Sequence, residues 1–173
     1  TATLNNIIVY AKGIHIKSGF HGNAQFFAKD SISVDSNCRF SYPSCLGILR
    51  FDKSGIVPVQ EKIHLGNHTT FSGILFTYEK TETSLKPMID LGKGVKIAGQ
   101  VYSQGIMRTK DAVEVDGSVF TSQFLYQNSF TLFQNYLINM TMNSKALSPY
   151  YLTGDLTPVA GKNKKVLQWL ETK

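Results

Sequence analysis

Three side chains in the second half of the chain could act together on a cation. His64, Asp90 and Glu114 each stand between two aliphatic residues, in phrases of the form Ile-x-Leu or Val-x-Val. If these phrases stack as equivalent parallel strands, their middle residues lie about 4.8 Å apart. An imidazole and two carboxylates suit a divalent ion, and stacked carboxylates raise one another's pKa. His64, Asp90 and Glu114 are therefore the candidate metal ligands.

The alternative for this column of residues is a polar stripe in water. Upstream copies of the phrase place His15 and Ser33 at the same middle position. Alternate side chains of a strand face opposite ways, so the middle residue faces away from the core. A convex surface has no walls to exclude water, and metal sites need hydrogen bonds that support the ligands. We favour the solvated stripe and predict no bound metal and no cofactor.

Catalytic motifs are missing from the sequence. It contains no GxSxG elbow, no Walker loop, no GxGxxG after a strand and no HExxH. The twelve acidic residues are spread along the chain, whereas a glycoside hydrolase needs two carboxylates at a controlled separation. We therefore predict no catalytic residue and no enzyme. Cys38 and Cys45 either form a bridge that closes a short loop or remain two small buried thiols.

The charge pattern argues against nucleic acid as a partner. The net charge is +6, but most lysines are scattered, and Arg39, Arg50 and Arg108 are the only arginines. Nucleic-acid binders usually gather basic residues on one face. No apolar run approaches the ~20 residues of a membrane-spanning helix, so we expect no membrane span within this chain.

An internal repeat must position these side chains. The segments 63–77 and 89–103 align without a gap, and 113–121 is a shortened copy. The aliphatic phrases begin at positions 14, 32, 63, 89 and 113, with uneven steps between them. Steps of this size are typical of a solenoid. Alternating apolar and polar residues indicate strands, and glycines recur where the chain must bend. A β-sandwich is the alternative, but it does not need one pattern to recur at one register.

The predicted fold is all-β: a short parallel β-helix with irregular loop insertions and a C-terminal capping segment. One domain covers residues 1–173, with a repeat core at about 14–124 and a final coil, tail and cap in 125–173. Residues 42–59 are predicted to form a protruding loop or edge, and residues 162–173 a terminal helix that covers an end. The predicted core residues are Ile63, Leu65, Ile89, Leu91, Val113 and Val115, and the rings predicted to stack are Phe76, Tyr102 and Phe120.

Two phrases carry a resemblance to a known family. Val95-Lys96-Ile97-Ala98-Gly99-Gln100-Val101 and Val113-Glu114-Val115-Asp116-Gly117-Ser118-Val119 resemble coils of the bactofilins, which are polymer-forming β-helical scaffolds of bacterial envelopes. The resemblance covers roughly residues 63–124. The steps between the phrases are longer than the short, even coils of that family. The resemblance implies a bacterial structural protein without an active site.

These observations predict a non-enzymatic structural or assembly protein of the bacterial cell envelope or the extracellular space. Its expected partners are copies of itself or other envelope proteins. We expect a monomer or weak oligomer, because both ends of the repeat look irregular and polar. The alternative is a carbohydrate-binding or carbohydrate-cleaving β-helix. A groove lined by exposed aromatic rings and paired acids would favour carbohydrate, and a smooth polar face with a capped end would favour structure.

Overall fold

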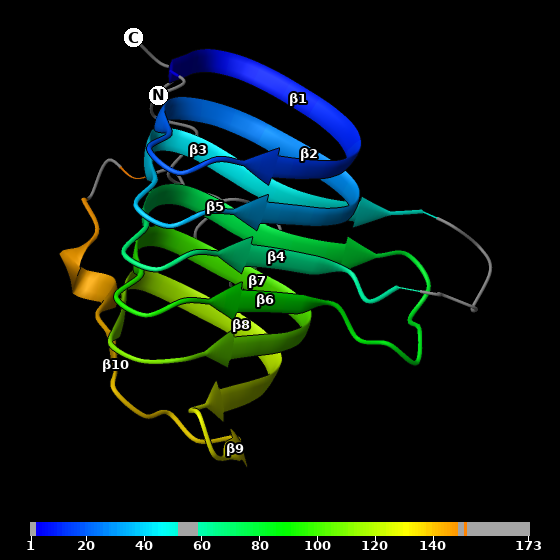
Figure 1. Ribbon diagram of the computed structural model, residues 1–173, viewed down its shortest axis with the longest axis vertical. Coiled ribbons are helices and arrows are strands. Elements are labelled where there is room, and N and C mark those ends of the chain that lie inside the picture. The colour runs from blue at the N-terminus through cyan, green and yellow to red at the C-terminus, as the bar shows by residue number, and fades with distance from the viewer. Residues whose placement is uncertain (1–2, 52–58, 149–150, 152–173) are drawn as a thin grey trace, which may run out of the picture.

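The computed structural model describes residues 3–51, 59–148 and 151, and in these residues the chain is all-β (Figure 1). The all-β class predicted from the sequence is confirmed. The elements are β1 (Thr3–Ile16), β2 (His21–Val34), β3 (Arg39–Arg50), β4 (Lys62–Leu65), β5 (Thr70–Glu79), β6 (Met88–Leu91), β7 (Lys96–Thr109), β8 (Val113–Gln127), β9 (Leu132–Gln134), β10 (Met140–Met142) and the short 3₁₀ helix η1 (Ser144–Ala146).

Nearly all strand pairing is parallel. The strands β2, β3, β5, β7, β6 and β4 pair in this order and close a ring of six, because β2 also pairs with β4. β1 is added on β2, and β8 is added on β7. β10 pairs in parallel with the start of β8, and β9 folds back antiparallel on its end. Figure 1 shows β1 to β8 stacked along the long axis of the molecule.

The pairing register reveals a shorter repeat than the aliphatic phrases suggest. Thr3 pairs with His21, and His21 pairs with Arg39, at equal intervals along the chain. We call this interval the short repeat. The steps from position 32 to 63 and from 63 to 89 are longer because each contains an additional connection between two strands. Residues 51–61 connect β3 to β4, and residues 80–87 connect β5 to β6.

The short repeat also corrects the position of the last phrase. After Ile89 the next equivalent residue is Met107, so the predicted start at Val113 is wrong. Met107-Arg108-Thr109 ends in threonine, which hid it from a search for two aliphatic residues.

The interior confirms the predicted core. All six aliphatic residues predicted to point inward have at most 2% of their surface exposed: Ile63, Leu65, Ile89, Leu91, Val113 and Val115. Burying each such side chain contributes ~1.5–3 kcal/mol. Towards β1 the interior is filled by aromatic rings, with Phe40 between Phe20 and Phe71 at centroid distances of 4.8 and 5.4 Å.

Glycines make one corner of the repeat. Gly99 and Gly117 have φ angles of +151° and +149°, which L side chains rarely adopt. A Cβ at Gly117 would lie 1.7 Å from the carbonyl oxygen of Gly99 on the neighbouring strand. Only glycine lets the backbones approach this closely, which explains why glycine recurs in the sequence repeat.

The register of the predicted aromatic stack is confirmed, because Phe76 pairs with Tyr102 and Tyr102 with Phe120. The predicted stacking itself is wrong, because among the described residues no ring contact joins Phe76, Tyr102 and Phe120. Phe76 instead contacts Phe27, at a centroid distance of 6.2 Å across Gly47. A Cβ at Gly47 would lie 2.4 Å from the Phe76 ring, so this glycine makes room for the contact.

The segment predicted to be a protruding loop or edge, residues 42–59, is more regular at its start than expected. Residues 42–50 belong to β3 and are not a loop. Pro43 is tolerated because the pairing of β3 with β5 shifts between Phe40 and Ser44, so its missing N–H breaks no ladder bond. Beyond Phe124, β8 continues to Gln127 before the β9 hairpin. The predicted terminal helix at 162–173 lies outside the described residues.

Candidate functional site

Asp90 on β6 is the centre of the most concentrated group of charges in the fold. The parallel register places it between His64 on β4 and Arg108 on β7. Arg108 donates two hydrogen bonds to it, Nε to Oδ1 and Nη2 to Oδ2, both at 2.8 Å. Lys62 Nζ lies 2.9 Å and His64 Nδ1 3.0 Å from Oδ2. Asp90 itself is only 1% exposed.

These partners decide the protonation state of Asp90. Burial opposes its charge, but the hydrogen bonds from His64, Arg108 and Lys62 together outweigh burial and hold the pKa of Asp90 well below its usual range. The hydrogen bond to Asp90 in turn raises the pKa of Arg108. Asp90 is therefore a charged carboxylate at neutral pH, and its two oxygens are both engaged by donors. It ties three neighbouring strands together and is not available as a proton donor or acceptor.

The predicted three-residue column is correct for His64 and Asp90 and wrong for Glu114. Glu114 pairs with Lys96 on another side of the repeat, where their side chains form an ion pair of 2.6 Å. The residue next to Asp90 is Arg108, a cation instead of a carboxylate. The solvated stripe is also wrong at Asp90, which is buried under its partners. Within residues 3–51, 59–148 and 151, no three metal-ligating side chains gather.

A polar pocket of about 740 Å³ adjoins this ion-pair group on the side of Arg108. Its lining comes from the turns that follow β4, β6 and β7, from the ends of β7 and β8, from the turn between β8 and β9, and from the residue before β10. The lining residues are Asn67, Lys93, Arg108, Lys110, Asp111, Tyr126, Gln127, Asn128, Ser129 and Asn139. Carboxamides and amines dominate this set. The sequence hid the pocket, because its residues come from turns that become neighbours only through the short repeat.

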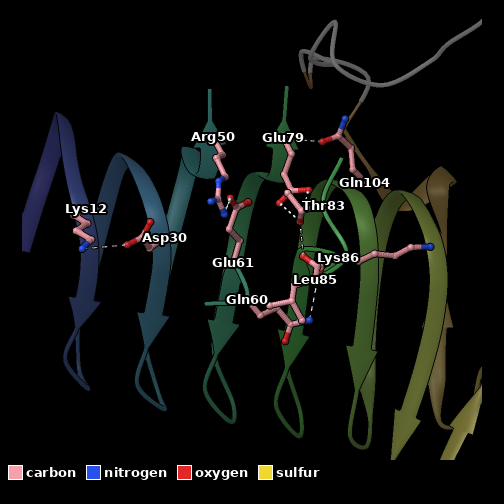
Figure 2. A network of polar contacts seen from close by, with 10 residues as sticks. All are labelled: Lys12, Asp30, Arg50, Gln60, Glu61, Glu79, Thr83, Leu85, Lys86 and Gln104. Carbon is pink, nitrogen blue, oxygen red and sulfur yellow. Dashed lines mark hydrogen bonds and ion pairs between the residues drawn. The ribbon is translucent and has the colours of Figure 1, made fainter. Parts of the chain in front are cut away.

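A second charged group lies where β3, β5 and the start of β4 meet (Figure 2). Arg50 Nη1 donates to Glu61 Oε1 at 3.1 Å, and Glu61 is only 1% exposed. Glu61 Oε2 is buried without a hydrogen-bond partner. Glu79 on β5, which is 5% exposed, accepts a hydrogen bond from Thr83. Two buried carboxylates thus share one corner of the fold.

This crowding changes the acidity of Glu61. Burial is the main cause that raises its pKa, and the nearby Glu79 carboxylate raises it further against the opposing effect of Arg50, to about 7. Sequence reasoning missed this group, although Arg50 and Glu79 are paired residues at the ends of β3 and β5. The sequence did contain a weak indication of it, because charged residues stand beside the connections 51–61 and 80–87.

The two cysteines are free thiols, so the bridge between them is wrong. Cys38 donates to the carbonyl oxygen of Lys17 at 3.3 Å. Burial raises the pKa of Cys45 to about 12. A thiol with so high a pKa carries almost no thiolate at neutral pH and is a poor nucleophile.

The end of the molecule at β1 carries exposed apolar side chains, contrary to the expectation of a polar end, whereas two register shifts in the pairing of β1 with β2 agree with the expected irregularity. In the described part of the chain, β1 pairs with β2 alone, which leaves its other edge without a partner strand. Ile8 and Tyr10 on β1 are 70% and 67% exposed. Beside them a hollow of about 500 Å³ opens into the core. Its apolar lining comes from Leu4, Ile14, Ile16, Phe20 and Phe26.

In the described residues, no helix is long and apolar enough to cross a membrane. Comparison with known proteins finds no matching family model, no matching curated protein and no matching solved structure. The candidate sites are therefore interpreted from their own geometry.

Proposed function

We propose that this chain is a short parallel β-solenoid with a non-enzymatic, structural role, and that it associates through the exposed edge of β1. The observation that carries this proposal is the edge itself. It is a strand of 14 residues, with two register shifts in its pairing to β2, exposed apolar side chains and no partner strand on its other edge among the described residues. An edge strand of this kind is a template for pairing with another chain.

The use of the charged residues supports a structural role. The ion pairs of Asp90 with Arg108 and of Lys96 with Glu114 join neighbouring strands, and that of Lys93 with Asp111 joins the turns that follow β6 and β7. A catalytic site would instead leave a nucleophile or a proton-transfer group directed at a pocket. Asp90 is engaged by donors, and the thiol of Cys45 is protonated, so neither group is such a candidate.

The opposite end of the stack supports a closed assembly. The outer edge of β8 is covered at residues 113–115 by β10 and at residues 125–127 by β9. Residues 116–124 of β8 have no partner strand on that side among the described residues. If β1 is nevertheless the edge that associates, the second copy docks β1 against β1 about a two-fold axis, which makes a dimer and not a filament. This agrees with the weak oligomer expected from the sequence, although the open end is apolar.

Sedimentation over a range of concentrations tests the proposal. We expect a monomer–dimer equilibrium that Ile8→Lys shifts to monomer, because the lysine places a charge in the apolar contact. Phe130→Lys is the matched control, since Phe130 is 97% exposed at the opposite end and its replacement should leave the equilibrium unchanged. A protein that stays monomeric at every concentration, or that dissociates only in the Phe130 variant, contradicts association through β1.

The proposed location of the protein at a bacterial cell envelope rests on the resemblance of its sequence to bactofilins. The short repeat supports this resemblance, because the longer steps come from insertions. Fractionation of cells that express the full-length gene tests the location, and recovery only in the cytosol would contradict it. For the carbohydrate alternative, the polar pocket lacks paired acids, since Asp111 is the only acid in its described lining.

A further inference from the structure

We propose that the polar pocket beside Arg108 binds an oxyanion, a phosphate or sulfate group carried on a small molecule. Three carboxamide side chains of the lining already accept hydrogen bonds through their oxygens. Asn67 Oδ1 accepts from the backbone N–H of Lys93 at 2.9 Å. Asn128 Oδ1 accepts from the backbone N–H groups of Phe130 and Thr131. Gln127 Oε1 accepts from Arg108 Nη1 at 2.9 Å.

These bonds fix which end of each carboxamide remains free. A backbone N–H or a guanidinium can only donate, so the bonded atom of each carboxamide must be its oxygen. The NH₂ groups of Asn67, Gln127 and Asn128 are left as unused donors beside the pocket. The side-chain Oδ1 of Asn139 is an unused acceptor, because the NH₂ group of that side chain donates to Asp111. Donors therefore outnumber acceptors among the unused carboxamide groups.

The charges favour a negative ligand. Asp111 is engaged by Asn139 and Lys93, and these contacts hold its pKa below the usual value. Arg108 and Lys62 share the single carboxylate of Asp90. The Lys110 side chain has no ion-pair or hydrogen-bond partner within the part of the chain that the structure describes. Among the described residues, three cations, Lys93, Arg108 and Lys110, thus line the pocket with one carboxylate, Asp111, and the Lys110 amine is free.

Phosphate and sulfate groups fit this combination because their oxygens accept several hydrogen bonds and carry negative charge. The pocket volume of about 740 Å³ exceeds what one inorganic anion fills. We therefore expect a phosphorylated or sulfated sugar to bind more tightly than the free anion. This inference does not depend on association through β1, because the two surfaces lie at opposite ends of the stack.

Titration of the whole protein, followed by NMR, tests the inference. The probes are glucose 6-phosphate, inorganic phosphate, inorganic sulfate and uncharged glucose. We expect saturable shifts of the side-chain NH₂ signals of Asn67, Gln127 and Asn128 with the anions, and none with glucose. If glucose 6-phosphate binds more tightly than inorganic phosphate, the ligand is a phosphate or sulfate ester. If the two bind with equal affinity, the ligand is the free anion. Both results support an oxyanion site.

Three variants make the test specific. Lys110→Gln should weaken binding about tenfold, the usual effect of losing one charged hydrogen bond. Asn128→Asp keeps the oxygen that the backbone of Phe130 and Thr131 needs, but it replaces a donor by a negative charge and should abolish binding. Lys12→Gln on β1 is the control and should bind as the unchanged protein does. Equal shifts with glucose, no saturable shift, or unchanged binding by Asn128→Asp would overturn the inference.

Discussion

At the scale of single residues, Asp90 is a buried carboxylate that is bonded to the side chains of Lys62, His64 and Arg108. We predict that Asp90→Ala destabilises the fold by about 3–5 kcal/mol, because it leaves Arg108 and Lys62 without their shared carboxylate. Glu114→Gln is the matched control. Its ion pair with Lys96 is exposed, so the loss should be below ~1 kcal/mol. Urea unfolding measures both, and similar losses in the two variants would contradict the assigned role of Asp90.

The raised pKa of Glu61 predicts how the stability of the fold depends on pH. Its pKa rises from 4.5 to about 7 on folding, so the folded state binds more protons than the unfolded state between these values. Stability should therefore fall by on the order of 3 kcal/mol as the pH rises from 4.5 to 7, and then level off. The charged groups around Glu61 are Arg50, Glu79 and Asp30. Asp90 adds no slope in this range, because its lowered pKa affects stability only in acid.

The isosteric variant Glu61→Gln isolates this effect. It cannot ionise, so the decline between pH 4.5 and 7 should vanish, and the variant should be more stable than the unchanged protein at pH 8. Urea unfolding midpoints at pH 5 and pH 8 provide the comparison. A slope that persists in Glu61→Gln would show that another group is responsible.

At the scale of the elements, the glycine corner should be the least tolerant part of the repeat. Gly117→Ala places a Cβ against the Gly99 carbonyl at a φ of +149°, and we expect it to cost about 2 kcal/mol or more. Gly13→Ala is the control, because its Cβ would meet the Ser31 hydroxyl only at 3.4 Å, with no unusual φ. Thermal unfolding measures the stability of both variants. Equal losses of stability would contradict the close backbone approach at the glycine corner.

The sequence predicts these elements where the repeat is uninterrupted. The copies at Ile63 and Ile89 align in the structure as they do in the sequence, since alternation and glycine spacing recur together. The short repeat stayed hidden, because two insertions lengthen two steps. Val113-Glu114-Val115 was misplaced for another reason. The strands of the repeat all alternate in the same way, so an aliphatic pair does not say to which strand of the repeat it belongs.

The candidate site shows the same limit. His64 and Asp90 could be placed together from the sequence because both stand in clear copies of one phrase. Arg108 and the pocket residues could not, because their positions depend on the register across the insertions. The burial of Asp90 was equally hidden, since its cover comes from the side chains of neighbouring strands.

At the scale of the whole molecule, every site described above depends on one claim: equivalent residues stack in parallel on neighbouring strands. His15, Ser33 and His64 are successive members of one such column. Neighbours in a parallel column lie about 4.8 Å apart, within the Cα separation of a disulfide, whereas residues two strands apart lie about twice as far. Paired cysteines can therefore measure the order of the column.

The most direct measurement is disulfide formation in the double variants, in a background of Cys38→Ser and Cys45→Ser, followed by mass spectrometry. Ser33→Cys combined with His64→Cys should oxidise to an intramolecular disulfide, as should His15→Cys with Ser33→Cys. His15→Cys with His64→Cys should stay reduced. Efficient cross-linking of the His15 and His64 variants, or none in the two neighbouring pairs, would contradict the parallel stack and favour a sandwich-like arrangement of the same strands.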